Sequence, residues 1–183
     1  MQLPNDHKVS VSKLSAVFNS TSASYKFYWF LAIIEAIEDG QEHIPKHELF
    51  ARMMANAWYT VNYFQVSFGK QDKIQSAIKF LIDHEQLDIN EKKHQLTQVL
   101  INSSSTATKK QLKHFDSEVP QRFLSPWIGS SASKKELYKL SQENLNFPPY
   151  VLYADSILIQ PDWLDYFKRN SGMLKDFCYW NLT

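Results

Sequence analysis

The residues best suited to a chemical task lie between Arg52 and Lys73, where aromatic, amide and basic side chains are interleaved. Aromatic faces can stack on nucleobases, and amide and cationic groups can hold bases and phosphates. The predicted stacking residues are Trp58, Tyr59 and Tyr63. The predicted polar contacts to nucleic acid are Arg52, Lys70, Gln71 and Lys73. A second interpretation stays open, in which these rings pack in a core and only their polar tips find partners.

The middle of the chain is basic, although the whole chain is close to neutral. Residues 91–135 hold 8 basic and 3 acidic residues, a net charge of +5, whereas the full sequence of 183 residues has a net charge of +1. Lys109, Lys110 and Lys113 lie in this segment and are predicted phosphate anchors, because neutralising phosphates releases counterions. Solvated helix faces also carry lysines, so an ordinary exposed helix is the alternative.

The spacing of the histidine, serine and cysteine residues does not match known catalytic or metal-binding motifs. His43 and His47 are four residues apart, but the order is not His-Glu-x-x-His, and Pro45 lies between them. Ser67 lacks the leading glycine of a nucleophile elbow. Cys178 has aromatic neighbours and is interpreted as a small buried apolar residue. We therefore predict no catalytic residue, no metal ligand and no cofactor in this chain.

The apolar periodicity predicts a mainly α fold, a multi-helix bundle with one small β-hairpin near residues 150–160. We expect helices over residues 13–18, 25–38, 46–58, 70–84, 90–101, 107–114, 134–143, 161–169 and 173–182. Asn90 is the expected N-cap of one of them, and Ser171-Gly172 is expected to separate the last two. Residues 59–68 are compatible with a helix or an extended chain, since they are rich in β-branched and aromatic types.

The chain is expected to divide at the small polar stretch Gly129 to Ser133. Residues 1–128 would form an aromatic-rich helical domain, with Tyr25, Phe27, Trp29 and Phe30 in its core. Residues 134–183 would form a smaller subdomain that contains the hairpin and the C-terminal helices.

Composition favours a cytoplasmic protein. The single cysteine permits no internal disulfide, which fits a reducing compartment. The polar N-terminus lacks the apolar stretch of a secretion signal, and no run approaches the roughly 20 apolar residues of a membrane helix. We expect no membrane association.

Several strings resemble the N-terminal region of bacterial HNH-type endonucleases. They are the run from Val17 to Leu31, Arg52-Met-Met-Ala-Asn-Ala-Trp-Tyr, and Val66-Ser-Phe-Gly-Lys-Gln-Asp, all within residues 14–73. Pro161-Asp-Trp-Leu and Phe177-Cys-Tyr-Trp-Asn-Leu resemble the stretch that leads into the nuclease domain of that family. Residues 90–150 resemble no family.

The resemblance implies a role in hydrolysis of DNA phosphodiesters, in which a histidine activates water and a divalent metal stabilises the leaving oxygen. Those residues are expected after Thr183, because the sequence contains no His-Asn-His constellation. The resemblance therefore implies a non-catalytic, DNA-recognition domain of such an enzyme, in restriction or phage defence, with DNA as its partner. The alternative is a protein-interaction module, including a homo-oligomer, that binds no nucleic acid.

Overall fold

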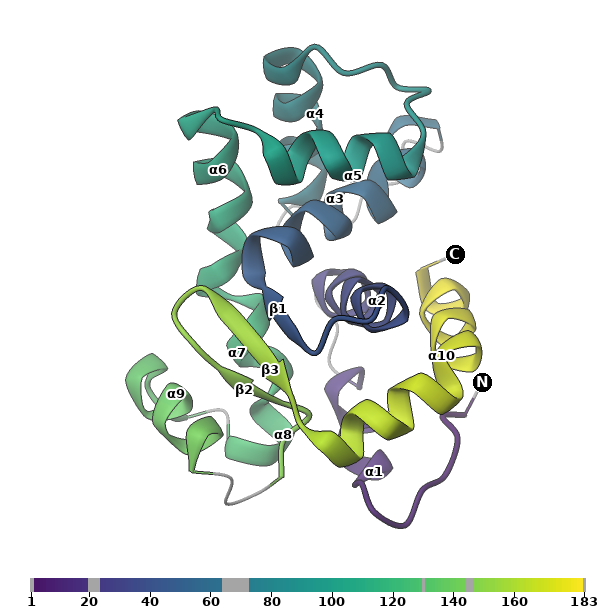
Figure 1. Cartoon of the computed structure of the whole chain (residues 1–183), viewed down its shortest axis with the longest axis vertical. Coiled ribbons are helices and arrows are strands. Elements are labelled where there is room, and N and C mark those ends of the chain that lie inside the picture. Colours follow the sequence, from purple (N-terminus) through teal and green to yellow (C-terminus); the bar gives the residue numbers. More distant parts are fainter. Residues whose placement is uncertain (1, 20–23, 64–72, 130, 144–146, 183) are drawn as a thin grey trace.

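The structure, a computed structural model, describes residues 2–19, 24–63, 73–129, 131–143 and 147–182. The fold is mainly α with a small antiparallel sheet, which confirms the predicted fold class. Helix α2 (Tyr25–Glu38) lies at the centre, between α3 (Lys46–Tyr63) on one side and α10 (Pro161–Leu182) on the other (Figure 1). Helix α1 (Val11–Val17) packs against the short helix α8 (Ser125–Ile128).

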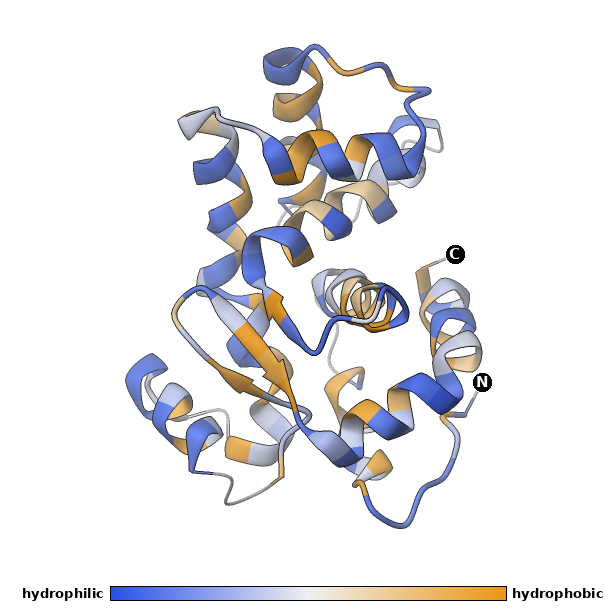
Figure 2. Cartoon of the chain, viewed as in Figure 1, coloured by the Kyte–Doolittle hydropathy of each residue, from blue (hydrophilic) through white to orange (hydrophobic). Residues whose placement is uncertain are grey.

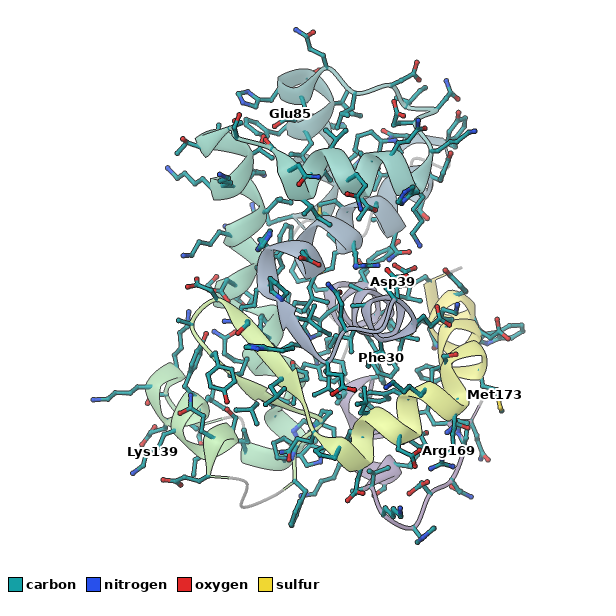
Figure 3. The ribbon with its side chains drawn as sticks, in the orientation of Figure 1. Phe30, Asp39, Glu85, Lys139, Arg169 and Met173 are labelled. Atoms are coloured by element: carbon teal, nitrogen blue, oxygen red, sulfur yellow. The ribbon has the colours of Figure 1, made fainter. Side chains whose placement is uncertain are left out.

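Helix α2 is central because apolar residues occupy nearly every face of it. Ten of its residues are buried, among them Trp29 and Phe30. In Figure 3, Phe30 points into the space between α2 and α10. Gly40, two residues after the end of the helix, has a φ of 86°, a left-handed conformation that glycine adopts without a steric penalty. Gly40 N–H donates to Ile37 O and Gln41 N–H to Ala36 O, the paired bonds of a Schellman motif.

Four helices form a layer above α2 in Figure 1: α3, α4 (Ile74–Glu85), α5 (Lys93–Asn102) and α6 (Thr106–Lys113). Helix α3 contacts α2, α4, α5 and α6, so it joins this layer to the rest of the molecule. Helix α5 is preceded by Lys92 as its N-cap residue, so the predicted cap at Asn90 is wrong. Asn90 instead belongs to a turn in which its N–H donates to the Asp88 carboxylate at 2.7 Å.

The described sheet has three strands in the order β1-β3-β2. The predicted hairpin is formed by β2 (Tyr150–Leu152) and β3 (Ser156–Ile159), in register Val151 to Leu158. Strand β1 (His43–Pro45) adds to the other edge of β3, a pairing that the sequence did not predict. Pro45 sits at the end of this edge strand, where a missing N–H is tolerated. Figure 2 shows the hydrophobic residues of β2 and β3.

Short helices pack beside the sheet. They are η1 (His114–Ser117), α7 (Val119–Phe123), α8 (Ser125–Ile128) and α9 (Lys134–Gln142). Pro126, in the first turn of α8, has no N–H with which to continue α7, and Gly129, with a φ of 96°, ends α8. Helix α9 begins with a capping box between Ser133 and Glu136.

Residues on both sides of Gly129–Ser133 belong to one hydrophobic core. Helix α10 packs on α2, and strand β1 pairs with β3. Helix packing and strand pairing therefore both cross the predicted division between residues 1–128 and 134–183. Helix α10 is continuous through Ser171 and Gly172, so the predicted break there is wrong.

Candidate nucleic-acid and ligand site

The three predicted lysine anchors lie on helix α6. Lys109, Lys110 and Lys113 are exposed, whereas Thr108 and Leu112 of the same helix are buried. Figure 2 shows the resulting bands of hydrophilic and hydrophobic residues along α6. The helix contains no acidic residue, and none of the three lysines forms an ion pair with any residue that the structure describes. Their ammonium groups are therefore available for phosphate.

The start of α6 is held by α4. Ser105 caps the helix, with its Oγ accepting from Thr108 N–H at 3.2 Å. Glu85, at the end of α4 (Figure 3), accepts hydrogen bonds from Ser103 Oγ and Thr108 Oγ1. These hydroxyl donors lower the pKa of the Glu85 carboxyl below its ordinary value. The anionic carboxylate also suits the N-terminal end of α6, where the helix dipole is positive.

A pocket of about 640 Å³ lies beside α6, within the range of roughly 300–1,000 Å³ of small-molecule sites. Its lining comes from four separated stretches of the chain. The lining residues are Lys46, His47, Phe50, Leu100, Ile101, Asn102, Ser103, Ser104, Lys109, Leu112, Lys113, Asp116, Ala154 and Asp155. Two of the predicted anchors, Lys109 and Lys113, thus line a pocket that is not apparent from the sequence.

One wall of the pocket is fixed by a buried lysine. Lys46 is only 3% exposed, and its ammonium donates to Asp116 Oδ1 at 2.8 Å, Tyr138 Oη at 2.6 Å and Ala154 O at 3.1 Å. The Lys46 backbone N–H also donates to Asp155 O at 2.8 Å. These bonds tie the first turn of α3 to η1, α9 and the β2–β3 turn, and they use all three ammonium hydrogens.

The prediction that Trp58 stacks on a nucleobase is wrong. Its side chain is fully buried and its Nε1–H donates to Ile89 O at 3.1 Å, so no ring face is open to a base. Tyr59 and Tyr63 are exposed and stack on one another, with ring centres 5.6 Å apart. Tyr63 Oη donates to Asn90 Oδ1, and Tyr59 Oη donates to Glu91 O at 3.4 Å.

The predicted polar contacts near these rings differ in their exposure and in whether they already form an ion pair. Arg52 has a side chain that is 13% exposed, and its Nη2 donates to Asp39 Oδ2 at 2.7 Å, so it is committed to an ion pair. Lys73 is exposed. Lys70 and Gln71 lie outside the described residues.

The structure does not bring the aromatic and lysine candidates together. Lys46 at the pocket and Tyr63 beside Tyr59 are the two ends of α3, an 18-residue helix whose length is about 25 Å. The lysine surface of α6 and its pocket are therefore one candidate site, and the tyrosine pair is separate from it.

No group of three or more His, Cys, Asp or Glu side chains within the described residues is placed to hold a metal ion. His43 and His47 are both exposed, and the first bonds to Ser156 Oγ. Cys178 is buried, as expected, and burial raises the pKa of its thiol, which suppresses the reactive thiolate.

Comparison with known proteins identifies no similar protein. The chain matches no protein-family model, no curated protein and no solved structure at a significant level. In the described part of the chain, no helix combines the length and apolar character needed to cross a bilayer.

Proposed function

We propose that this chain is a DNA-engaging accessory domain of an HNH-type endonuclease, acting in restriction or phage defence. The observation that carries the DNA contact is the set of exposed lysines on α6, Lys109, Lys110 and Lys113, which form no ion pair with any described residue. Clustered cations without acidic partners favour phosphate contact, because no internal ion pair must break first. The link to HNH endonucleases rests on the sequence strings given above.

The test is duplex DNA binding as a function of salt. Charge reversal of all three α6 lysines to Glu should abolish binding, or reduce the slope of log affinity against log salt by about 3, near 0.9 for each lost phosphate contact. The matched control reverses three other exposed lysines, Lys79, Lys92 and Lys135, and so has the same net charge. Equal effects of the two triple variants, or no effect of the first, would refute phosphate contact by α6.

A second candidate function, self-association, is favoured by one observation on α10. Met173 and Trp180 are 50% and 71% exposed and lie seven residues apart, on one face of the helix. In Figure 3, Met173 points away from the body of the molecule. Sedimentation of the wild type and of Met173→Lys decides between the two: a dimer that the substitution dissociates supports self-association.

A further inference from the structure

The pocket beside α6 has features that contact with duplex phosphates does not require. Phosphate contact needs only exposed cations, whereas Lys109 and Lys113 line a pocket of about 640 Å³. They are four residues apart on one helix face, roughly 6 Å between their Cβ atoms. Lys110, between them in sequence, is not among the described residues that line it. Two cations from one helix therefore contribute positive charge to the lining of a concave site.

The interior of the pocket is largely apolar. Phe50 contributes an aromatic side chain, while Leu100, Ile101 and Leu112 contribute aliphatic ones. A largely apolar lining that also contains two cations of one helix favours a ligand that has an apolar body and an anionic group. A free inorganic anion would leave the interior unused, because burial of apolar surface is the main source of affinity in such sites.

Polar atoms elsewhere in the lining discriminate between two such ligands. The carboxylate of Asp116 lines the pocket, and its Oδ2 accepts no hydrogen bond within the described part of the chain. The Asn102 amide and the Ser104 hydroxyl line it too. A hydrocarbon tail would cover these groups without bonding to them, which is costly. A nucleobase is flat enough to lie on apolar side chains and carries donors and acceptors along its edge.

The geometry points to a mononucleotide group as the ligand of this pocket. The base lies on the apolar interior, its edge bonds to Asp116 and Asn102, and the phosphate is held by Lys109 and Lys113. The same chemistry has two sources, a free nucleotide or one unstacked nucleotide of a DNA strand. The second source rests on the proposed DNA-binding function.

In the first experiment, calorimetry measures the affinity of the intact chain for each of the four common nucleoside monophosphates. Inorganic phosphate and dodecanoate serve as comparison ligands. At least one nucleotide should bind more tightly than either of them. Lys109→Gln and Lys113→Gln should each weaken that binding by about tenfold, because each removes a charge-assisted hydrogen bond. Lys110→Gln should change it by less than about twofold, as expected of a cation outside the pocket.

A blocking variant tests the pocket without altering its charges. Ser104 is exposed and lines the pocket, so Ser104→Trp should fill it, while Thr106→Trp is the control at an exposed position outside the lining. Nucleotide binding should fall more than about tenfold in the first variant, equivalent to about 1.4 kcal/mol, and should be unchanged in the second. Tighter binding of dodecanoate than of any nucleotide, or binding that Ser104→Trp leaves intact, would overturn the inference.

A second experiment separates the two sources of the ligand. A duplex with one unpaired, bulged nucleotide is compared with a fully paired duplex of the same length. If the nucleotide comes from a strand, the bulged duplex should bind more tightly, and Ser104→Trp should remove only that preference. No binding of free nucleotides together with no bulge preference would overturn the inference.

The two proposals fail in different ways. If Lys110→Glu weakens binding of the paired duplex while no nucleotide binds and no bulge is preferred, the DNA-binding function stands and the pocket inference fails. If free nucleotides bind and Ser104→Trp abolishes this, while reversal of the α6 lysines leaves duplex affinity unchanged, the pocket inference stands and the DNA-binding function fails.

Discussion

At the scale of single residues, the pocket depends on a lysine that is itself unavailable to a ligand. The three donors of Lys46 are all used within the protein, so its charge is neutralised by Asp116 rather than offered to an anion. The positive charge available in the pocket therefore comes from Lys109 and Lys113. Lys46 has a positioning role, because it holds the first turn of α3 against η1 and the β2–β3 turn.

Removal of the partner of this lysine should be strongly destabilising. In Asp116→Ala the Lys46 ammonium stays buried without a counterion, and we expect a loss of about 2 to 4 kcal/mol in the free energy of unfolding. The lower part of that range applies if water from the pocket reaches the ammonium. Urea unfolding measures the change. Asp155→Ala is the control, because its exposed carboxylate also lines the pocket, and it should change stability by less than about 0.5 kcal/mol. Equal stabilities of the two variants would contradict this role.

At the scale of elements, periodicity and end signals determined which parts of the fold could be predicted. Helix α2 begins and ends at the predicted residues, because a continuous apolar run is followed by Asp39-Gly40. Strand β1 could not be predicted, since three residues carry no periodicity and their partner, β3, is over a hundred residues away. Trp58 was misassigned for a related reason. Trp58 falls on the same buried face of α3 as Met54 and Val61, and only the packing of distant elements against that face distinguishes a core ring from a stacking ring.

The lysines of the candidate site could be predicted, but the pocket could not. Charge bias is local, so residues 91–135 show it directly in the sequence. The pocket is assembled from the start of α3, the end of α5, α6 with η1, and the β2–β3 turn, which only tertiary packing brings together. Lys46 and Asp116 are 70 residues apart, and no short-range pattern links them.

Two glycines in helical regions should respond oppositely to substitution by alanine. Gly172 lies inside α10 in open space, so Gly172→Ala should stabilise the protein by about 0.5 to 1 kcal/mol through the higher helix propensity of alanine. Gly40 has a φ of 86° and ends α2, so Gly40→Ala should destabilise it by about 1 kcal/mol, although a methyl group would meet no neighbour there either. Urea unfolding of both variants checks the pair. Destabilisation by Gly172→Ala would indicate that α10 is interrupted there.

At the scale of the whole molecule, the N-terminal segment that contains Pro4 and Asp6 is hydrogen-bonded to α10. Arg169 Nη2 donates to Asp6 Oδ2 at 2.9 Å, and Tyr166 Oη donates to Pro4 O at 2.8 Å. Asp6 Oδ1 also accepts from the backbone N–H of Lys8 at 2.7 Å and of Val9 at 3.2 Å. The hydrogen bonds from Arg169 and Lys8 lower the pKa of Asp6 to about 2. Burial is the main reason that the pKa of Tyr166 rises to about 12. These contacts join the N-terminal segment to the first half of α10.

The contribution of Asp6 should depend on pH in a defined direction. Its pKa is about 2 in the folded protein and close to 3.8 in the unfolded chain, so the stability it adds is complete above about pH 4 and is lost as the pH falls towards 2. Asp6→Asn should therefore be less stable than the wild type at pH 7, and the two should converge near pH 2. Urea unfolding across this range tests the expectation. Asp176→Asn, at an exposed position of α10 that forms no ion pair with any described residue, should follow the wild type throughout. A stability difference between Asp6→Asn and the wild type that stays constant from pH 7 to 2 would show that the Asp6 carboxylate does not fasten the N-terminal residues to α10.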